Sequence, residues 1–188
     1  MSGQLSVADR AFIRVLRDAN VLQDVRKHLL DQSNGAIFVG CSDADRFGDI
    51  FKHHADMQTS CRTDPRIHVL AWHGGALACA PCSPINRRKH ADEVFLDQIT
   101  DARALKGINL VALYAHAPCG AAGLHGVSLE RALAIQIRAK LRIKMLNNGI
   151  QVACFFHVDY GEGVKRTYFF SRERWEAWAT EHSIRAIA

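Results

Sequence analysis

Residues 36–46 (AIFVGCSDADR) place a thiol and two carboxylates directly after a short apolar run. The run contains β-branched residues and predicts a buried strand from Ala36 to Val39. A thiolate beside carboxylates is electrostatically unfavourable unless something positive lies between them. A bound metal dication removes the conflict, because it keeps a thiol ionised and tolerates nearby carboxylates. Cys41 is therefore a candidate metal ligand.

Two further candidate ligands follow another apolar run. Residues 108–116 (INLVALYAH) are apolar on both faces, which is typical of a central parallel strand, and the chain continues as HAPCG with His116 and Cys119. If both strands are central, these two residues and Cys41 converge at one edge of the sheet, where α/β proteins bind ligands. Two thiolates and one imidazole are a zinc ligand set that leaves the fourth position open.

The remaining elements follow from hydrophobic periodicity and from helix caps. Ser6 and Asp9 begin an N-terminal helix, or two short ones, within residues 7–30, whereas residues 47–65 look polar and irregular with room for one helical turn. Further strands are predicted at 67–72, 150–158 and 164–170, and further helices at 90–105, from Ser128 to 147 and after Ser171. The prediction is an α/β fold with a mostly parallel central sheet of four strands, an antiparallel edge strand and flanking helices.

Length and composition favour one globular domain over residues 1–188, with residues 1–33 as an N-terminal helical arm. The apolar runs are too short to cross a bilayer, and the first residues lack a secretory pattern, so we expect a cytoplasmic protein without a membrane partner. The net charge is +5, but the basic residues alternate with apolar ones at helical spacing. That pattern favours solvated helix faces over a nucleic-acid surface.

The segments CSD (residues 41–43) and HAPCG (residues 116–120) together resemble the two motifs of the β-class carbonic anhydrases. The loop AWHGGAL is similar to a third family segment, although His73 and Gly74 replace its first two residues. The resemblance covers roughly residues 36–160 by order of elements. It implies zinc on Cys41, His116 and Cys119, with zinc-bound hydroxide attacking CO2 to give bicarbonate, or attacking a related substrate such as carbonyl sulfide.

The resemblance also implies further site residues and an assembly. Asp43 would orient the attacking hydroxide, Arg46 would hold Asp43, and backbone amides of Gly74 and Gly75 would help to bind the substrate oxygen. The family is built from dimers in which N-terminal helices wrap the neighbour, and residues 7–30 are amphipathic enough to do so. We therefore expect a homodimer or a multiple of it.

One departure from the family pattern concerns the arginine. Asp45 stands where the family has its Arg, and Arg46 follows one residue later, a rotation of about 100° on a helix. Arg46 regains Asp43 only if the turn is rebuilt. We expect instead that Asp43 loses this partner, becomes a fourth zinc ligand at neutral pH, and confines activity to alkaline solution. Non-catalytic roles are the alternative: Asp43 as the N-cap of a helix, and Arg46 as a surface or structural residue.

Two other functions are consistent with the sequence. One is a carbonic anhydrase-like protein that binds zinc without catalysis. The other is a thiol-disulfide protein that uses Cys79 and Cys82 of the CAPC segment, which with Cys61 could also form a second metal site. Of the remaining candidates, His53 and His54 are expected at the surface, His125 near the pocket, His157 on a strand face and Cys154 in the core.

Overall fold

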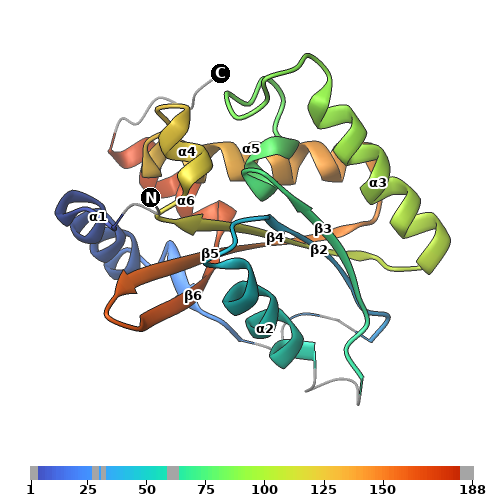
Figure 1. Cartoon of the computed structure of the whole chain (residues 1–188), viewed down its shortest axis with the longest axis horizontal. Helices are drawn as coiled ribbons and strands as arrows, with labels where there is room; N and C mark the ends of the chain where they lie inside the picture. The colour runs from blue at the N-terminus through green and yellow to red at the C-terminus, as the bar shows by residue number, and fades with distance from the viewer. Residues whose placement is uncertain (1–3, 27–29, 31–32, 59–63, 183–188) are drawn as a thin grey trace.

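A six-stranded sheet forms the middle layer of the molecule, with α2 on one face and α3 and α5 on the other (Figure 1). The computed structural model describes residues 4–26, 30, 33–58 and 64–182. The strands are β1 (Leu22–Asp24), β2 (Ala36–Cys41), β3 (Ile67–Trp72), β4 (Leu110–Ala117), β5 (Gln151–Gly161) and β6 (Val164–Phe170). The helices are α1 (Val7–Asp18), α2 (Phe47–Gln58), the 3₁₀ helix η2 (Gly75–Cys79), α3 (Ala91–Lys106), α4 (Gly120–Leu124), α5 (Leu129–Leu146) and α6 (Arg172–Glu181).

The sheet has the strand order β1-β6-β5-β4-β2-β3. The neighbouring strands β3, β2, β4 and β5 run parallel, and β6 pairs antiparallel with β5. The predicted α/β fold class is therefore confirmed. One detail of the prediction was wrong: β6 is not the edge strand, because β1 pairs with its outer side. Three residues are too few to show a strand periodicity in the sequence.

The helix ends follow the expected capping residues. The side chains of Ser6, Ser128 and Ser171 each accept a hydrogen bond from a backbone N–H in the first turn of α1, α5 and α6. Gly107 ends α3 in the left-handed conformation. These caps confirm the predicted starts of the three helices and the end of α3.

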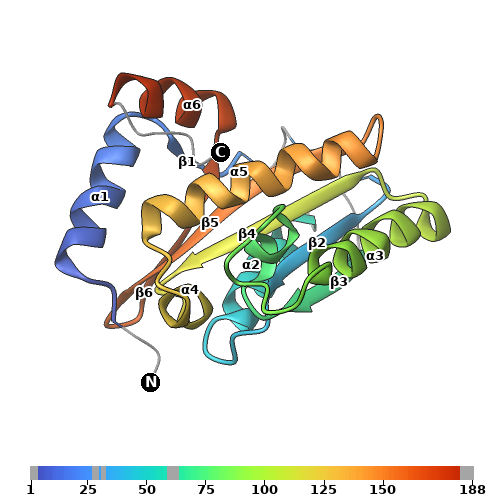
Figure 2. The same cartoon turned by 90° about the horizontal axis from the view of Figure 1, so that it is seen from above.

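The N-terminal helix is shorter than expected and packs on its own chain. It ends at Asp18, after which Asn20 adopts a positive φ of 56° and the chain turns into β1. Ile13 and Leu16 are buried, and the Phe12 ring lies edge-on to Trp178 of α6. Figure 2 shows α1 and α6 at the same end of the molecule. Within the described residues α1 therefore packs on its own chain, and the helical arm over residues 1–33 stays a prediction.

The helix α2 corrects the expectation of an irregular segment after residue 47. Its buried residues are Ile50, His54, Met57 and Gln58, and Ile50 and Met57 pack in one hydrophobic cluster with Tyr114 of the sheet. His54 is fully buried, contrary to our prediction, with Nδ1 3.1 Å from the Tyr114 hydroxyl, and burial lowers its pKa to about 3. A histidine in the middle of the buried stripe hid the helical period. Among the described helices, none has the length and apolar character needed to span a membrane.

Candidate metal centre

The carboxyl ends of β2 and β4 bring three candidate ligands together. Cys41 is the last residue of β2, His116 is the penultimate residue of β4, and Cys119 precedes the short helix α4. Their ligand atoms all lie within 4.8 Å of one another. In the described ranges, no other group of three or more Cys, His, Asp or Glu side chains has this arrangement. The sheet thus produces the convergence expected from the two strand ends.

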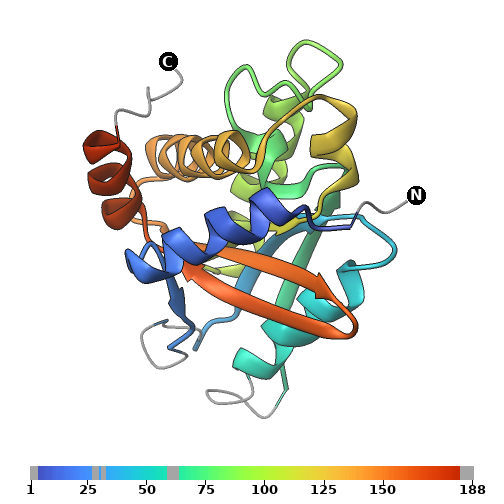
Figure 3. The ribbon, with the colours of Figure 1, turned by 90° about the vertical axis from the view of Figure 1, so that its left-hand side faces the viewer.

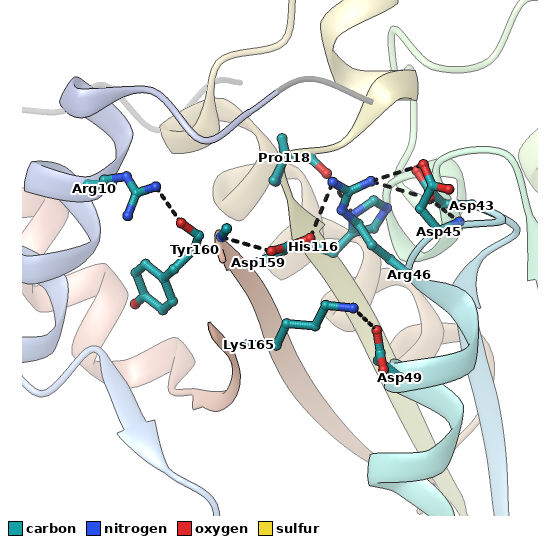
Figure 4. A network of polar contacts seen from close by, with 11 residues as sticks. Arg10, Asp43, Asp45, Arg46, Asp49, His116, Pro118, Asp159, Tyr160 and Lys165 are labelled. Atoms are coloured by element: carbon teal, nitrogen blue, oxygen red, sulfur yellow. Dashed lines mark hydrogen bonds and ion pairs between the residues drawn. The ribbon is translucent and has the colours of Figure 1, made fainter. Parts of the chain in front are cut away.

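The His116 ring is oriented to present one nitrogen to a metal. Its Nδ1 lies 2.9 Å from the backbone carbonyl oxygen of Pro118 (Figure 4), and this nitrogen must carry the proton because a carbonyl only accepts. The Nε2 atom therefore has a free lone pair. It is buried and has no hydrogen-bond partner among the described residues. A buried, unpaired imidazole nitrogen beside two thiols fits a metal ligand whose other nitrogen is held by the backbone.

The hydrogen bond between the two thiols shifts their pKa values in opposite directions. A hydrogen bond from Cys41 lowers the Cys119 pKa to about 7, against the opposing effect of burial, and the backbone N–H groups of Ala121 and Ala122 help. The same bond, together with burial, raises the Cys41 pKa to about 12. A divalent cation in the cluster would favour the ionised form of both sulfurs. The donor set therefore fits zinc, which prefers thiolate and imidazole ligands.

The glycine loop before η2 supports the end of β2. The Gly74 N–H donates to Cys41 Sγ over 3.3 Å, so this amide already stabilises the sulfur. Gly75 has φ +54°, and a Cβ there would lie 2.5 Å from the Gly40 carbonyl carbon and closer still to the Cys41 nitrogen. The absence of a side chain thus allows the loop to approach the Cys41 backbone. The role of Gly74 and Gly75 in substrate binding stays a prediction.

We expect Gly75→Ala to destabilise the fold by about 3 kcal/mol, because the new methyl group meets backbone atoms that no rotamer change can move away. It should also lower metal affinity, since the displaced backbone carries Cys41. The matched control is Gly107→Ala, which has a similar φ of +63° but nothing within 4 Å of the added Cβ. That variant should lose only about 1 kcal/mol in urea unfolding. Equal losses in both variants would contradict the steric argument.

Asp43 and Arg46 form an ion pair, which corrects the expectation that the shifted arginine loses its partner. Arg46 is buried, and its Nη1 lies 3.5 Å from Asp43 Oδ1. The chain turns between the two residues, with the N–H of Phe47 donating to the Asp43 carbonyl over 2.9 Å. Side chains three residues apart lie on the same side of a helical turn, so Arg46 reaches Asp43. Asp43 is not part of the 4.8 Å ligand cluster, so it is not placed as a fourth ligand.

A second carboxylate, Asp159, holds the other side of the guanidinium. Its Oδ2 lies 3.4 Å from Arg46 Nη2, whereas Asp45 is 3.7 Å from Nη1 and its side chain is 65% exposed (Figure 4). Asp159 was missed in the sequence because no motif surrounds it. It reaches Arg46 because β5 continues to Gly161, three residues beyond its predicted end. The arginine thus links the loop after β2 to the β5–β6 hairpin.

A cavity of about 520 Å³ opens beside two of the candidate ligands. His116, Cys119 and apolar residues including Leu124 and Val127 line it. His125 is not among the lining residues, so its predicted place at the pocket is not supported. His157 lies on a strand face as expected, beside His116 in the β4–β5 register, with its Nδ1 2.9 Å from Thr167 Oγ1.

The other cysteines do not form a second centre in the described part of the chain. Cys154 is buried in the core, as predicted. Cys79 is also fully buried, and burial raises the pKa of its thiol, so it is unsuited to attack a disulfide. Cys82 is an exposed free thiol, and Cys61 lies outside the described residues. These features disfavour the thiol-disulfide alternative.

Comparisons with known proteins give structural similarities only. No protein-family model matches the chain, and no curated protein matches it. The chain is similar to a carbonic anhydrase from Streptococcus mutans, at 13% identity and a TM-score of 0.45, over 87% of this chain and 99% of that one. It is also similar to the β-carbonic anhydrase CafA of Aspergillus fumigatus, at 13% identity and a TM-score of 0.39, over 93% and 90%. With identities this low, function has to be inferred from the site residues themselves.

Proposed function

We propose that this chain is a zinc-dependent lyase that hydrates carbon dioxide to bicarbonate in the manner of the β-class carbonic anhydrases. The observation that carries the proposal is the position of Asp43. This carboxylate pairs with Arg46, accepts a hydrogen bond from the Asp45 N–H and is not part of the Cys41, His116 and Cys119 cluster, which supports a metal site whose fourth position would stay open. An open position beside three protein ligands is the arrangement of a catalytic zinc site, whereas structural sites are closed.

The residues around the cluster have distinct roles in this reaction. Bound zinc would supply the Lewis acidity that makes water a nucleophile at neutral pH. Asp43, held by Arg46, accepts a hydrogen bond from the attacking oxygen and aims its lone pair at the carbon of CO2. The cavity at His116 and Cys119 has a partly apolar lining, which admits a linear, uncharged substrate. Carbonyl sulfide has the same shape and stays an alternative substrate.

A zinc protein without catalytic activity is the second candidate, and Asp45 favours it. This carboxylate lies near the same nitrogen of Arg46 as Asp43 does. Competition for one guanidinium nitrogen would weaken the hold on Asp43.

The homodimer and the cytoplasmic location are also part of the proposal and stay predictions. Sedimentation at micromolar concentration measures the first, and a monomer would contradict that part alone.

Metal analysis and stopped-flow CO2 hydration on the same preparation test the proposed function. We expect one zinc per chain and hydration that is lost with a chelator and restored by zinc. Stoichiometric zinc without hydration of CO2, and without hydrolysis of carbonyl sulfide, would indicate the non-catalytic protein. A preparation that binds no zinc but oxidises reversibly would instead support the thiol-disulfide alternative.

A further inference from the structure

A pocket of about 490 Å³ lies between α1 and the β5–β6 hairpin, and four arginines line it. Figure 3 shows α1 crossing this hairpin. We call this the arginine pocket. Its guanidinium groups belong to Arg10, Arg14, Arg17 and Arg166. None of the candidate metal ligands lines it, so it is separate from the site described above.

The charge of the arginine pocket is not balanced within the described residues. Arg10, Arg14 and Arg17 follow one another at spacings of four and three on α1, which places like charges side by side on one helix. Arg166 adds a fourth charge from β6, and Asp18 is the one acidic residue in the lining. All four arginines are exposed, and no ion pair to any of them occurs among the described residues.

Two of the guanidinium groups are already held in place. Arg10 donates to the Tyr160 carbonyl oxygen (Figure 4), and the Arg17 guanidinium lies 5.1 Å from the centre of the Tyr168 ring. Side chains that are ordered in advance lose less entropy when a ligand binds.

The two tyrosines add hydroxyl groups to the lining. Their oxygens are 2.9 Å apart, so one hydroxyl donates to the other and the second keeps its proton for a ligand. Burial and this hydrogen bond raise the pKa of Tyr160, which keeps its hydroxyl neutral. The pocket therefore presents hydrogen-bond donors to match its positive charge.

We propose that the arginine pocket binds a small organic polyanion that carries two or more phosphoryl or carboxylate groups. The planar guanidinium fork matches both groups by paired hydrogen bonds. Because four arginines and one aspartate line the pocket, its charge is positive, and a ligand with more than one negative charge would balance it best. The volume suits a molecule of metabolite size. This site is additional to the proposed hydration of CO2.

Calorimetric titration of the full chain with fructose 1,6-bisphosphate and with tricarballylate tests this proposal, because both are polyanions that hold zinc weakly. We expect saturable binding of at least one, tighter than that of orthophosphate at equal ionic strength. The stronger of the two identifies the anionic group. Arg14→Gln and Arg166→Gln should each weaken binding about tenfold, the effect of one charge-assisted contact.

Arg174→Gln is the matched control, because this exposed arginine of α6 does not line the pocket. Arg174→Gln removes one positive charge from the chain, as Arg14→Gln and Arg166→Gln do, but it should leave the affinity for the polyanion unchanged. Absence of saturable binding of either probe would overturn the proposal. Binding that Arg14→Gln and Arg166→Gln leave unchanged would also overturn it, since the anion would then occupy another site such as the candidate metal centre.

Discussion

Cys119→Ser is expected to lower zinc affinity by at least about a thousandfold, because a zinc site of this kind contributes about 10–16 kcal/mol and one of three protein ligands is removed. A serine hydroxyl stays protonated at neutral pH and cannot replace a thiolate. Cys119 is only partly buried, and serine is nearly the same size, so the fold itself should tolerate the change. CO2 hydration should fall with the zinc content.

Cys82→Ser is the control for Cys119→Ser. Cys82 is an exposed free thiol outside the ligand cluster. Its replacement should leave one zinc per chain and an unchanged thermal midpoint. Added zinc should raise the midpoint of the native chain and of Cys82→Ser, but not that of Cys119→Ser, because a ligand stabilises only the state that binds it. Full zinc content in Cys119→Ser would refute the ligand assignment.

The convergence of the three ligands could be expected from the sequence because it depends on strong local signals. The apolar runs that end at Cys41 and His116 are too hydrophobic for any place but the middle of a parallel sheet. Neighbouring parallel strands end at the same edge, so their terminal side chains meet without any knowledge of the loops. Cys119 is only three residues after His116, so it lies at the same edge of the sheet.

The environment of Arg46 could not be expected from the sequence, because it depends on a contact between distant segments. The position of Arg46 relative to Asp43 suggested a lost partner, yet a turn places residues three apart side by side. Asp159 is more than a hundred residues away, and its contact depends on the length of β5. Register and strand length are set by tertiary packing and leave no local pattern. The same holds for α2, whose buried face includes His54.

Arg46→Gln tests whether this ion-pair network keeps the candidate centre open. Arg46 is the cation between Asp43 and Asp159, whose side chains are 16% and 19% exposed. Without it, two mostly buried carboxylates lose their charged partner, and we expect a loss of about 2–4 kcal/mol in urea unfolding, somewhat less than for a fully buried pair. Glutamine keeps much of the volume of the side chain, so the loss reports mainly on charge.

Arg46→Gln should also slow catalysis. A released Asp43 can turn toward the cluster and compete for the open position, and a misplaced orienting group costs about a hundredfold in rate. Hydroxide competes better as pH rises, so hydration by the variant should recover in alkaline solution, whereas the native chain should be active near pH 7. The measurement is stopped-flow hydration against pH at full zinc content.

Asp45→Asn separates the role of Arg46 from a general change of charge near the site. Asp45 is 3.7 Å from the same guanidinium, but its side chain is 65% exposed, and exposed ion pairs contribute about 0–1 kcal/mol. Its removal should leave stability nearly unchanged, and it should leave hydration equal to the native rate or slightly faster, because Asp43 no longer shares Nη1. If Arg46→Gln instead kept the native rate and pH profile, the arginine would serve the fold alone. The Arg46–Asp43 ion pair would then not be what keeps the fourth metal position open.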